Sequence, residues 1–74
     1  MNYLNNLNTG DQATIQGIDA EQALYQRLLA LGFRVGKKIE LIRRASFNGP
    51  LHVRIGTTDI IMRASEARLI QITH

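Results

Sequence analysis

The 74 residues include nine Lys and Arg against six Asp and Glu, a formal charge of +3 that permits an acidic partner without requiring one. A chain this short has apolar residues for only one core, so we expect a single domain over residues 1–74. It has no cysteine, which excludes disulfides and thiolate metal sites. It shows neither a signal peptide pattern nor the ~20-residue apolar run of a membrane-spanning helix. We therefore expect a soluble, cytoplasmic protein.

The first half of the chain predicts a docking segment, a strand and a helix. Tyr3, Leu4 and Leu7 are spaced to pack one helical turn on the core. Apolar and polar residues then alternate over residues 12–18, which predicts the first strand. Asp19, with Gln22 three residues later, predicts the start of a helix through a capping box. The stripe that this helix is expected to bury consists of Ala20, Leu24, Leu28 and Leu31.

Residues 28–41, LLALGFRVGKKIEL, predict a joint between this helix and the second strand. Gly32 stands where a helix C-terminus favours a residue in the left-handed conformation, and Gly36 turns the chain into the strand. Phe33 and Val35 are expected to pack over the end of the helix.

The second half predicts strands over residues 37–44, 51–55 and 59–63, and a last short strand that contains Ile70 and Ile72. A loop over residues 45–49 joins the first two of these, and Ser65 is expected to cap a single helical turn before the last strand. Five short strands with one inserted helix predict a mainly β fold. Our first choice is a small, SH3-like, partly closed antiparallel barrel, and our second is an OB-like barrel.

The sequence carries no constellation for catalysis. The glycines of residues 32–38 lie too close together for a phosphate-binding loop, Lys38 replaces the Ser or Thr that holds magnesium, and a strand follows in place of a helix. His52 and His74 have no second ligand at metal spacing, and the carboxylates are scattered. We expect no enzyme activity and no cofactor, and ligand spacing does not support a transition-metal site.

Two surface features suggest a partner. Tyr25 and Leu29 lie around the helix from the core stripe, so they either cover a barrel rim or form a partner-binding patch edged by Phe33, Arg34 and Lys37. A basic cluster comprises Arg34, Lys37, Lys38, Arg43 and Arg44. It is either a solvated strand face or a contact for an acidic protein loop or an anionic membrane leaflet. With Phe33 and Phe47 nearby, the cluster also fits a weak nucleic-acid binder, which is the alternative reading.

Two motifs together resemble the FeoA family. One is the joint Leu31-Gly32-Phe33 with Gly36, and the other is Arg63, Glu66-Ala67 and Ile70 near the C-terminus. The resemblance follows the whole chain in order. Its other matching residues are Leu4, Leu7, Gly10, Ile15, Ile18, Arg27, Leu28, Arg43, Arg44, Gly49, Pro50, Gly56 and Ile72. One departure is Ala45-Ser46, in a loop where the family often has a proline.

The resemblance implies an SH3-like fold and a non-catalytic accessory or regulatory role in bacterial ferrous iron uptake. The implied partner is FeoB, the membrane GTPase that carries Fe(II), which would recruit the protein to the inner face of the membrane. The same domain type also ends some metal-dependent repressors, and a stand-alone relative of that domain is a second alternative. Because no DNA-binding domain precedes this one, we expect the accessory protein. Whether it forms a homo-oligomer stays open.

Overall fold

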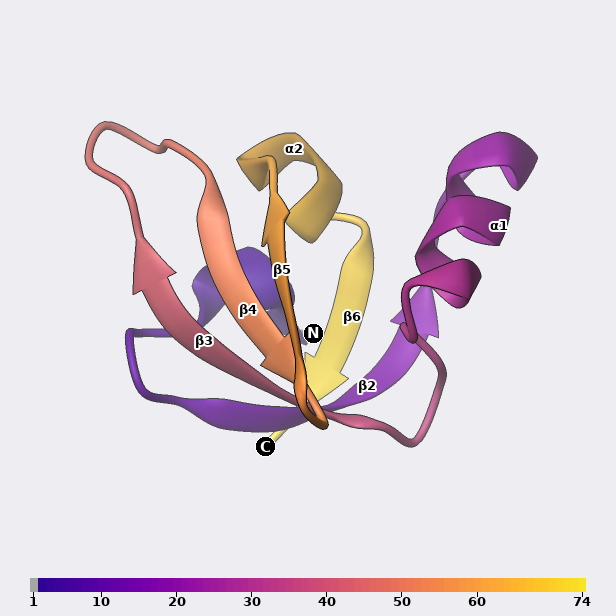
Figure 1. Ribbon diagram of the computed structural model, residues 1–74, viewed down its shortest axis with the longest axis horizontal. Helices are drawn as coiled ribbons and strands as arrows, with labels where there is room; N and C mark the ends of the chain where they lie inside the picture. The colour runs from indigo at the N-terminus through magenta and orange to yellow at the C-terminus, as the bar shows by residue number, and fades with distance from the viewer. Residues whose placement is uncertain (1) are drawn as a thin grey trace.

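The computed structural model describes residues 2–74 as one curved antiparallel sheet with three short helical segments (Figure 1). The strands follow the order β1-β6-β2-β3-β4-β5. Their bounds are β1 (Asn2–Tyr3), β2 (Gln12–Ile18), β3 (Lys38–Arg44), β4 (Leu51–Ile55), β5 (Thr58–Met62) and β6 (Ile70–Thr73). The helical segments are the 3-10 turn η1 (Leu4–Asn6), α1 (Gln22–Ala30) and α2 (Ala64–Ala67). The predicted mainly β, partly closed barrel is confirmed.

Alternation of apolar and polar residues explains why the main strands fall where the sequence predicts them. In β2, Ala13 and Ile15 are buried while Gln12 and Gln16 are exposed, which is the pattern of a strand with one face on a core. The structure adds a strand that the sequence did not predict, since β1 pairs with β6 ahead of η1. Two residues are too few to show a period of two, so β1 leaves no signal in the sequence.

The core is apolar throughout, and the described residues include no buried polar or charged residue. Phe33 is its largest fully buried side chain. The other buried residues are Leu4, Leu7, Ala13, Ile15, Leu28, Ile39, Leu41, Leu51, Val53, Ile55, Ile60, Met62, Ala67, Ile70 and Ile72. Helix α1 contributes only Leu28 to this set, so it lies against the side of the barrel rather than within it (Figure 1).

Both predicted helix caps are wrong. The amide of Asp19 donates to the carbonyl of Leu69 (2.8 Å), which keeps the chain extended, and α1 starts only at Gln22 with Glu21 as its N-cap. Ser65 does not cap α2, which starts one residue earlier with Arg63 as its N-cap. A long-range contact therefore sets the start of α1, whereas α2 begins where the carboxylate of Glu66 accepts the amide of Arg63, three residues earlier.

Candidate partner-binding surface

The end of α1 is fixed by two backbone hydrogen bonds. The amide of Gly32 donates to the carbonyl of Leu29 (3.0 Å), and the amide of Phe33 donates to that of Leu28 (3.0 Å). This pair of bonds is a Schellman motif, which needs a positive φ at the residue after the C-cap. Gly32 holds that position with φ of 105°. The predicted joint is therefore confirmed, and it sends Phe33 into the core.

Gly36 makes the second half of the joint. The amide of Lys37 donates to the carbonyl of Arg34 (3.1 Å), and Gly36, with φ of 93°, occupies the third position of the turn so formed. The amide of Gly36 also donates to the carbonyl of Ile15 in β2 (2.8 Å), which fastens the joint to the barrel. The side chains of Arg34 and Lys37 are exposed on this turn.

One of the five residues of the predicted patch does not lie on the surface of the protein. Tyr25 is 37% exposed, Leu29 is half-buried, and Arg34 and Lys37 are exposed. Phe33 has no exposed surface, so its place at the edge of a partner patch is wrong. The sequence could not distinguish the two roles, because a residue just past a helix either folds back over the helix end or points into solvent.

Two apolar residues that we expected to be packed are exposed instead. Leu31 is 41% exposed and Val35 is 66% exposed. The reason is Phe33, which enters the core from the joint and leaves its apolar neighbours outside. The apolar and basic residues exposed at this end, here called the α1–joint surface, are Tyr25, Leu31, Arg34, Val35 and Lys37.

An ion pair holds α1 beside α2. The guanidinium of Arg27 donates to the carboxylate of Glu66, whose side chain is 19% exposed. The same carboxylate accepts the backbone amide of Arg63 (2.9 Å) at the start of α2. Glu66 therefore fixes α2 and positions α1 at once, which gives this residue of the C-terminal motif a structural role.

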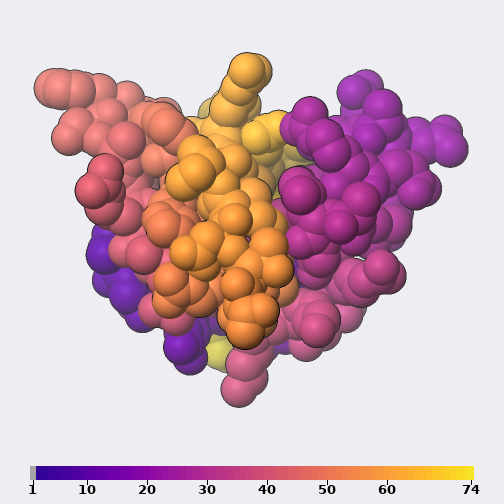
Figure 2. All heavy atoms as spheres, in the orientation of Figure 1, coloured from indigo at the N-terminus to yellow at the C-terminus, as the bar shows by residue number. Residues whose placement is uncertain are grey.

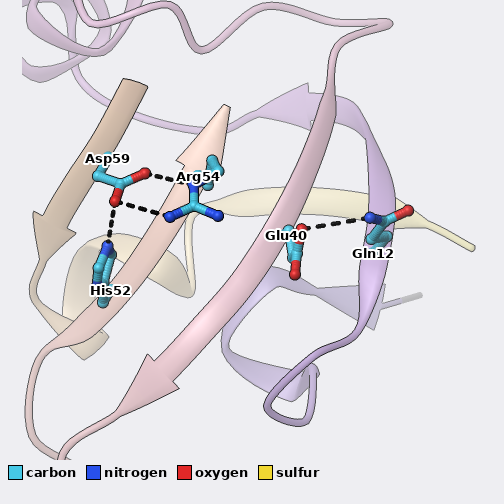
Figure 3. A network of polar contacts seen from close by, with 5 residues as sticks. All are labelled: Gln12, Glu40, His52, Arg54 and Asp59. Atoms are coloured by element: carbon cyan, nitrogen blue, oxygen red, sulfur yellow. Dashed lines mark hydrogen bonds and ion pairs between the residues drawn. The ribbon is translucent and has the colours of Figure 1, made fainter. Parts of the chain in front are cut away.

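A second polar network lies on the outer face of β4 and β5 (Figure 3). The carboxylate of Asp59 accepts two hydrogen bonds from Arg54, at 2.6 and 3.1 Å. Nε2 of His52 lies 3.0 Å from the same carboxylate. That nitrogen is enclosed, and its contact with Asp59 is an ion pair only in the protonated form of the imidazole. Arg54 first, and His52 second, lower the pKa of Asp59 to about 2.

The predicted basic cluster is divided by the fold. Arg34 and Lys37 precede β3 and Lys38 begins it, whereas Arg43 lies near its end, about 17 Å from Lys38 at the usual rise of a strand. Arg44 is not available to a ligand, because its guanidinium donates to the backbone carbonyls of Asn5 (2.7 Å) and Leu7 (2.8 Å). The alternation of residues along β3 could not predict these hydrogen bonds of Arg44, because their acceptors lie in another segment of the chain.

Residues 2–74 bring no three His, Asp or Glu side chains together in a way that could hold a metal ion. Within the same residues, no helix is long and apolar enough to cross a membrane. What the geometry does provide is a small antiparallel barrel with exposed apolar and basic surface at its joint.

The chain belongs to the FeoA family, because residues 3–74 match the FeoA domain. It is 33% identical over 69 residues to a putative Fe(2+) transport protein A of Campylobacter jejuni, a match that covers 93% of each chain. It is also 32% identical over 69 residues to an Fe(2+) transport protein A/Fe(2+) transporter FeoB fusion protein of Porphyromonas gingivalis. That match covers 93% of this chain and 8% of the fusion protein.

Solved structures agree with this assignment. The iron(II) transport protein A of Clostridium thermocellum superposes with a TM-score of 0.90 at 31% identity, over 96% of this chain and 44% of that one. FeoA of Stenotrophomonas maltophilia, solved with zinc and described as a prokaryotic SH3 domain protein, gives 0.86 at 26% identity, over 97% and 89%. A manganese-dependent transcriptional repressor gives 0.88 at 20% identity, over 97% and 40%, which shows a shared fold alone. The predicted SH3-like architecture is confirmed.

Proposed function

We propose that this protein is a non-catalytic accessory protein of ferrous iron uptake that acts by direct contact with FeoB. The observation that carries the proposal is the Porphyromonas gingivalis relative, in which an Fe(2+) transport protein A and FeoB form one polypeptide. A fusion holds its two domains at a high effective concentration. Where the two proteins are separate chains that act together, they must bind each other to come into contact. The name of the Campylobacter jejuni relative supports a role in the same transport.

The proposal places the protein in the cytoplasm, recruited to the inner face of the membrane by its partner. The α1–joint surface is the proposed contact, because it combines exposed apolar side chains with a charged rim, as small interfaces do. Tyr25 and Val35 supply the apolar part, and Arg34 and Lys37 supply the rim. The half-buried Leu29 supports Tyr25 from within α1.

Capture of this protein by the cytosolic domain of a FeoB transporter tests the proposal. We expect Tyr25→Ser with Val35→Ser to lower capture at least tenfold and to leave the melting midpoint within a few degrees. Ile61→Ser is the matched control, because Ile61 is as exposed as Val35 (67% against 66%) but lies on β5. If both variants still bind as the unchanged protein does, the α1–joint surface is not the contact. If the unchanged protein shows no capture at all, the partner is wrong.

The non-catalytic part of the proposal has its own test. Titration of the protein with GTP in a calorimeter should give no heat of binding at micromolar concentrations, and micromolar binding would overturn it. The nucleic-acid alternative is disfavoured by the division of the basic cluster between the two ends of β3 and by the internal contacts of Arg44. A tight, sequence-selective complex with DNA or RNA would restore that alternative.

A further inference from the structure

The loop between β3 and β4 (residues 45–50) holds a side chain that serves no purpose within the fold. Phe47 is fully exposed, at 102% of its reference surface, and its φ is 58°. Large side chains rarely adopt a left-handed backbone, and when they do, the conformation is imposed by the surroundings. The loop projects from the body of the molecule at the upper left in both overall views (Figure 1 and Figure 2).

The backbone of this loop explains why the position is unusual. The amide of Gly49 donates to the carbonyl of Ser46 (3.2 Å), and Phe47 and Asn48 between them have φ of 58° and 61°. Two central residues with positive φ define a type I′ turn, the hairpin turn that favours Asn and Gly. Asn48 fits that preference and Phe47 does not. Neither backbone preference nor packing explains a phenylalanine at the tip.

Three arginines surround the base of the loop. Arg43 lines a hollow of about 240 Å³ on one side of Pro50, and Arg63 and Arg68 line another of about 470 Å³ on its other side. All three are exposed, and within residues 2–74 none of their side chains makes an ion pair or a side-chain hydrogen bond. The acidic residue nearest to Arg63 and Arg68 in the chain is Glu66, and its carboxylate is already paired with Arg27.

The geometry points to the 45–50 loop as a site that binds an anionic lipid surface, with Phe47 inserted among the headgroups and the three arginines against lipid phosphates. A membrane fits better than a protein because the feature is a convex tip. A stable protein interface needs a broad complementary area, whereas a bilayer accepts a lone aromatic side chain with diffuse cations around it. The inference does not depend on the contact with FeoB, since the joint residues Arg34 and Lys37 of the α1–joint surface precede β3, whereas the 45–50 loop follows it.

Insertion of the tip can be read by fluorescence, because the chain has no tryptophan. Phe47→Trp places a single tryptophan at the tip, and Thr57→Trp places one in the exposed turn at the opposite end of β4, so that excitation selective for tryptophan excludes the two tyrosines. We expect vesicles of equal parts phosphatidylglycerol and phosphatidylcholine to shift the emission of the first variant to the blue and to leave that of the second unchanged. Vesicles of phosphatidylcholine alone should shift neither. Equal shifts in both variants, or none in the first, would refute the insertion.

Co-sedimentation with the same vesicles tests the residues. Phe47→Asn should weaken binding about tenfold, because it removes the inserted apolar group. Asn suits the turn, so the melting midpoint should stay the same or rise. A lower midpoint would mean that Phe47 has a structural role and would overturn the proposal.

The charges need a matched pair of variants. Arg63→Gln with Arg68→Gln and Arg34→Gln with Lys37→Gln each lower the formal charge from +3 to +1. At about fivefold per arginine near a membrane surface, the first pair should weaken binding more than tenfold and the second should have little effect. Equal losses would show that net charge alone drives adsorption, and the site would be rejected. If Phe47→Asn instead abolishes capture by the cytosolic domain of FeoB without lipid, the tip is a protein contact and the lipid assignment is wrong.

Discussion

Replacement of Phe33 by leucine tests the central structural correction, that this residue belongs to the core and not to a partner surface. Phe33 is completely buried, and leucine lacks three of its carbon atoms. At about 0.8 kcal/mol per buried carbon group, less what the core regains by relaxing, Phe33→Leu should lower the free energy of unfolding by about 1.5–2.5 kcal/mol. For a domain of this size the melting midpoint should fall by about 10 °C.

Thermal unfolding followed by circular dichroism measures this change, and capture by the cytosolic domain of FeoB is measured well below the new midpoint. Val35→Ala is the matched control for stability, because Val35 lies two residues away and is 66% exposed. This substitution should change the free energy of unfolding by no more than about 0.5 kcal/mol. We expect Phe33→Leu to be less stable but to bind as the unchanged protein does. An unchanged midpoint together with lost capture would refute the burial of Phe33 and return it to the partner surface.

Three further changes test other features. Gly32→Ala should lower the free energy of unfolding in urea by about 1–2 kcal/mol, because Gly32 has φ of 105°. The loss should come from backbone strain alone, since no atom lies within 4 Å of an added Cβ. An unchanged urea midpoint would contradict the Schellman motif. Asp59 has a folded pKa of about 2, below its unfolded value, so its contribution to folding stability is present above about pH 4 and is lost as the pH falls toward 2. Asp59→Asn should therefore make the free energy of unfolding depend less on pH over that window. A pH profile identical to that of the unchanged protein would argue against the pairing with Arg54. Arg27→Ala should lower the free energy of global unfolding by less than about 1 kcal/mol, as for other exposed ion pairs. It should nevertheless speed amide hydrogen exchange in α1. Equal exchange rates in the two proteins would mean that the contact with Glu66 does not hold the helix.

Much of the fold follows from local pattern. Alternation placed β2, β3, β4 and β5 within a residue of their observed bounds, and the two glycines located the joint. These signals are local because each depends on one residue's backbone or on the two faces of one strand. The helix starts could not be predicted, because the extended backbone at Asp19 is set by its bond to Leu69, fifty residues later in the chain.

The residues of the candidate surface could be predicted less well from the sequence. Helical spacing nominated Tyr25 correctly as an outward residue, but it assigned Leu31 to the core, where the structure exposes it. Phe33 was expected both over the helix end and at the edge of the patch, and the structure buries it. The two errors have one cause, since they depend on the direction in which the chain leaves the helix. The three arginines at the base of the 45–50 loop were also hidden, because Arg43 and the pair Arg63 and Arg68 come from distant segments that only the fold brings near Pro50.

The position of β5 at the end of the strand order has a consequence for self-association. Among the described residues β5 pairs only with β4, so its other edge presents backbone groups to which a second molecule could add a strand. Ile61 on that strand is largely exposed and would favour such an addition, while the neighbouring carboxylate of Asp59 opposes it. Because the pKa of Asp59 is about 2, this carboxylate stays charged down to about pH 2. The guanidinium and the imidazole that lower that pKa therefore keep a negative charge beside this open edge between about pH 4 and pH 2, where an unpaired aspartate is largely neutral.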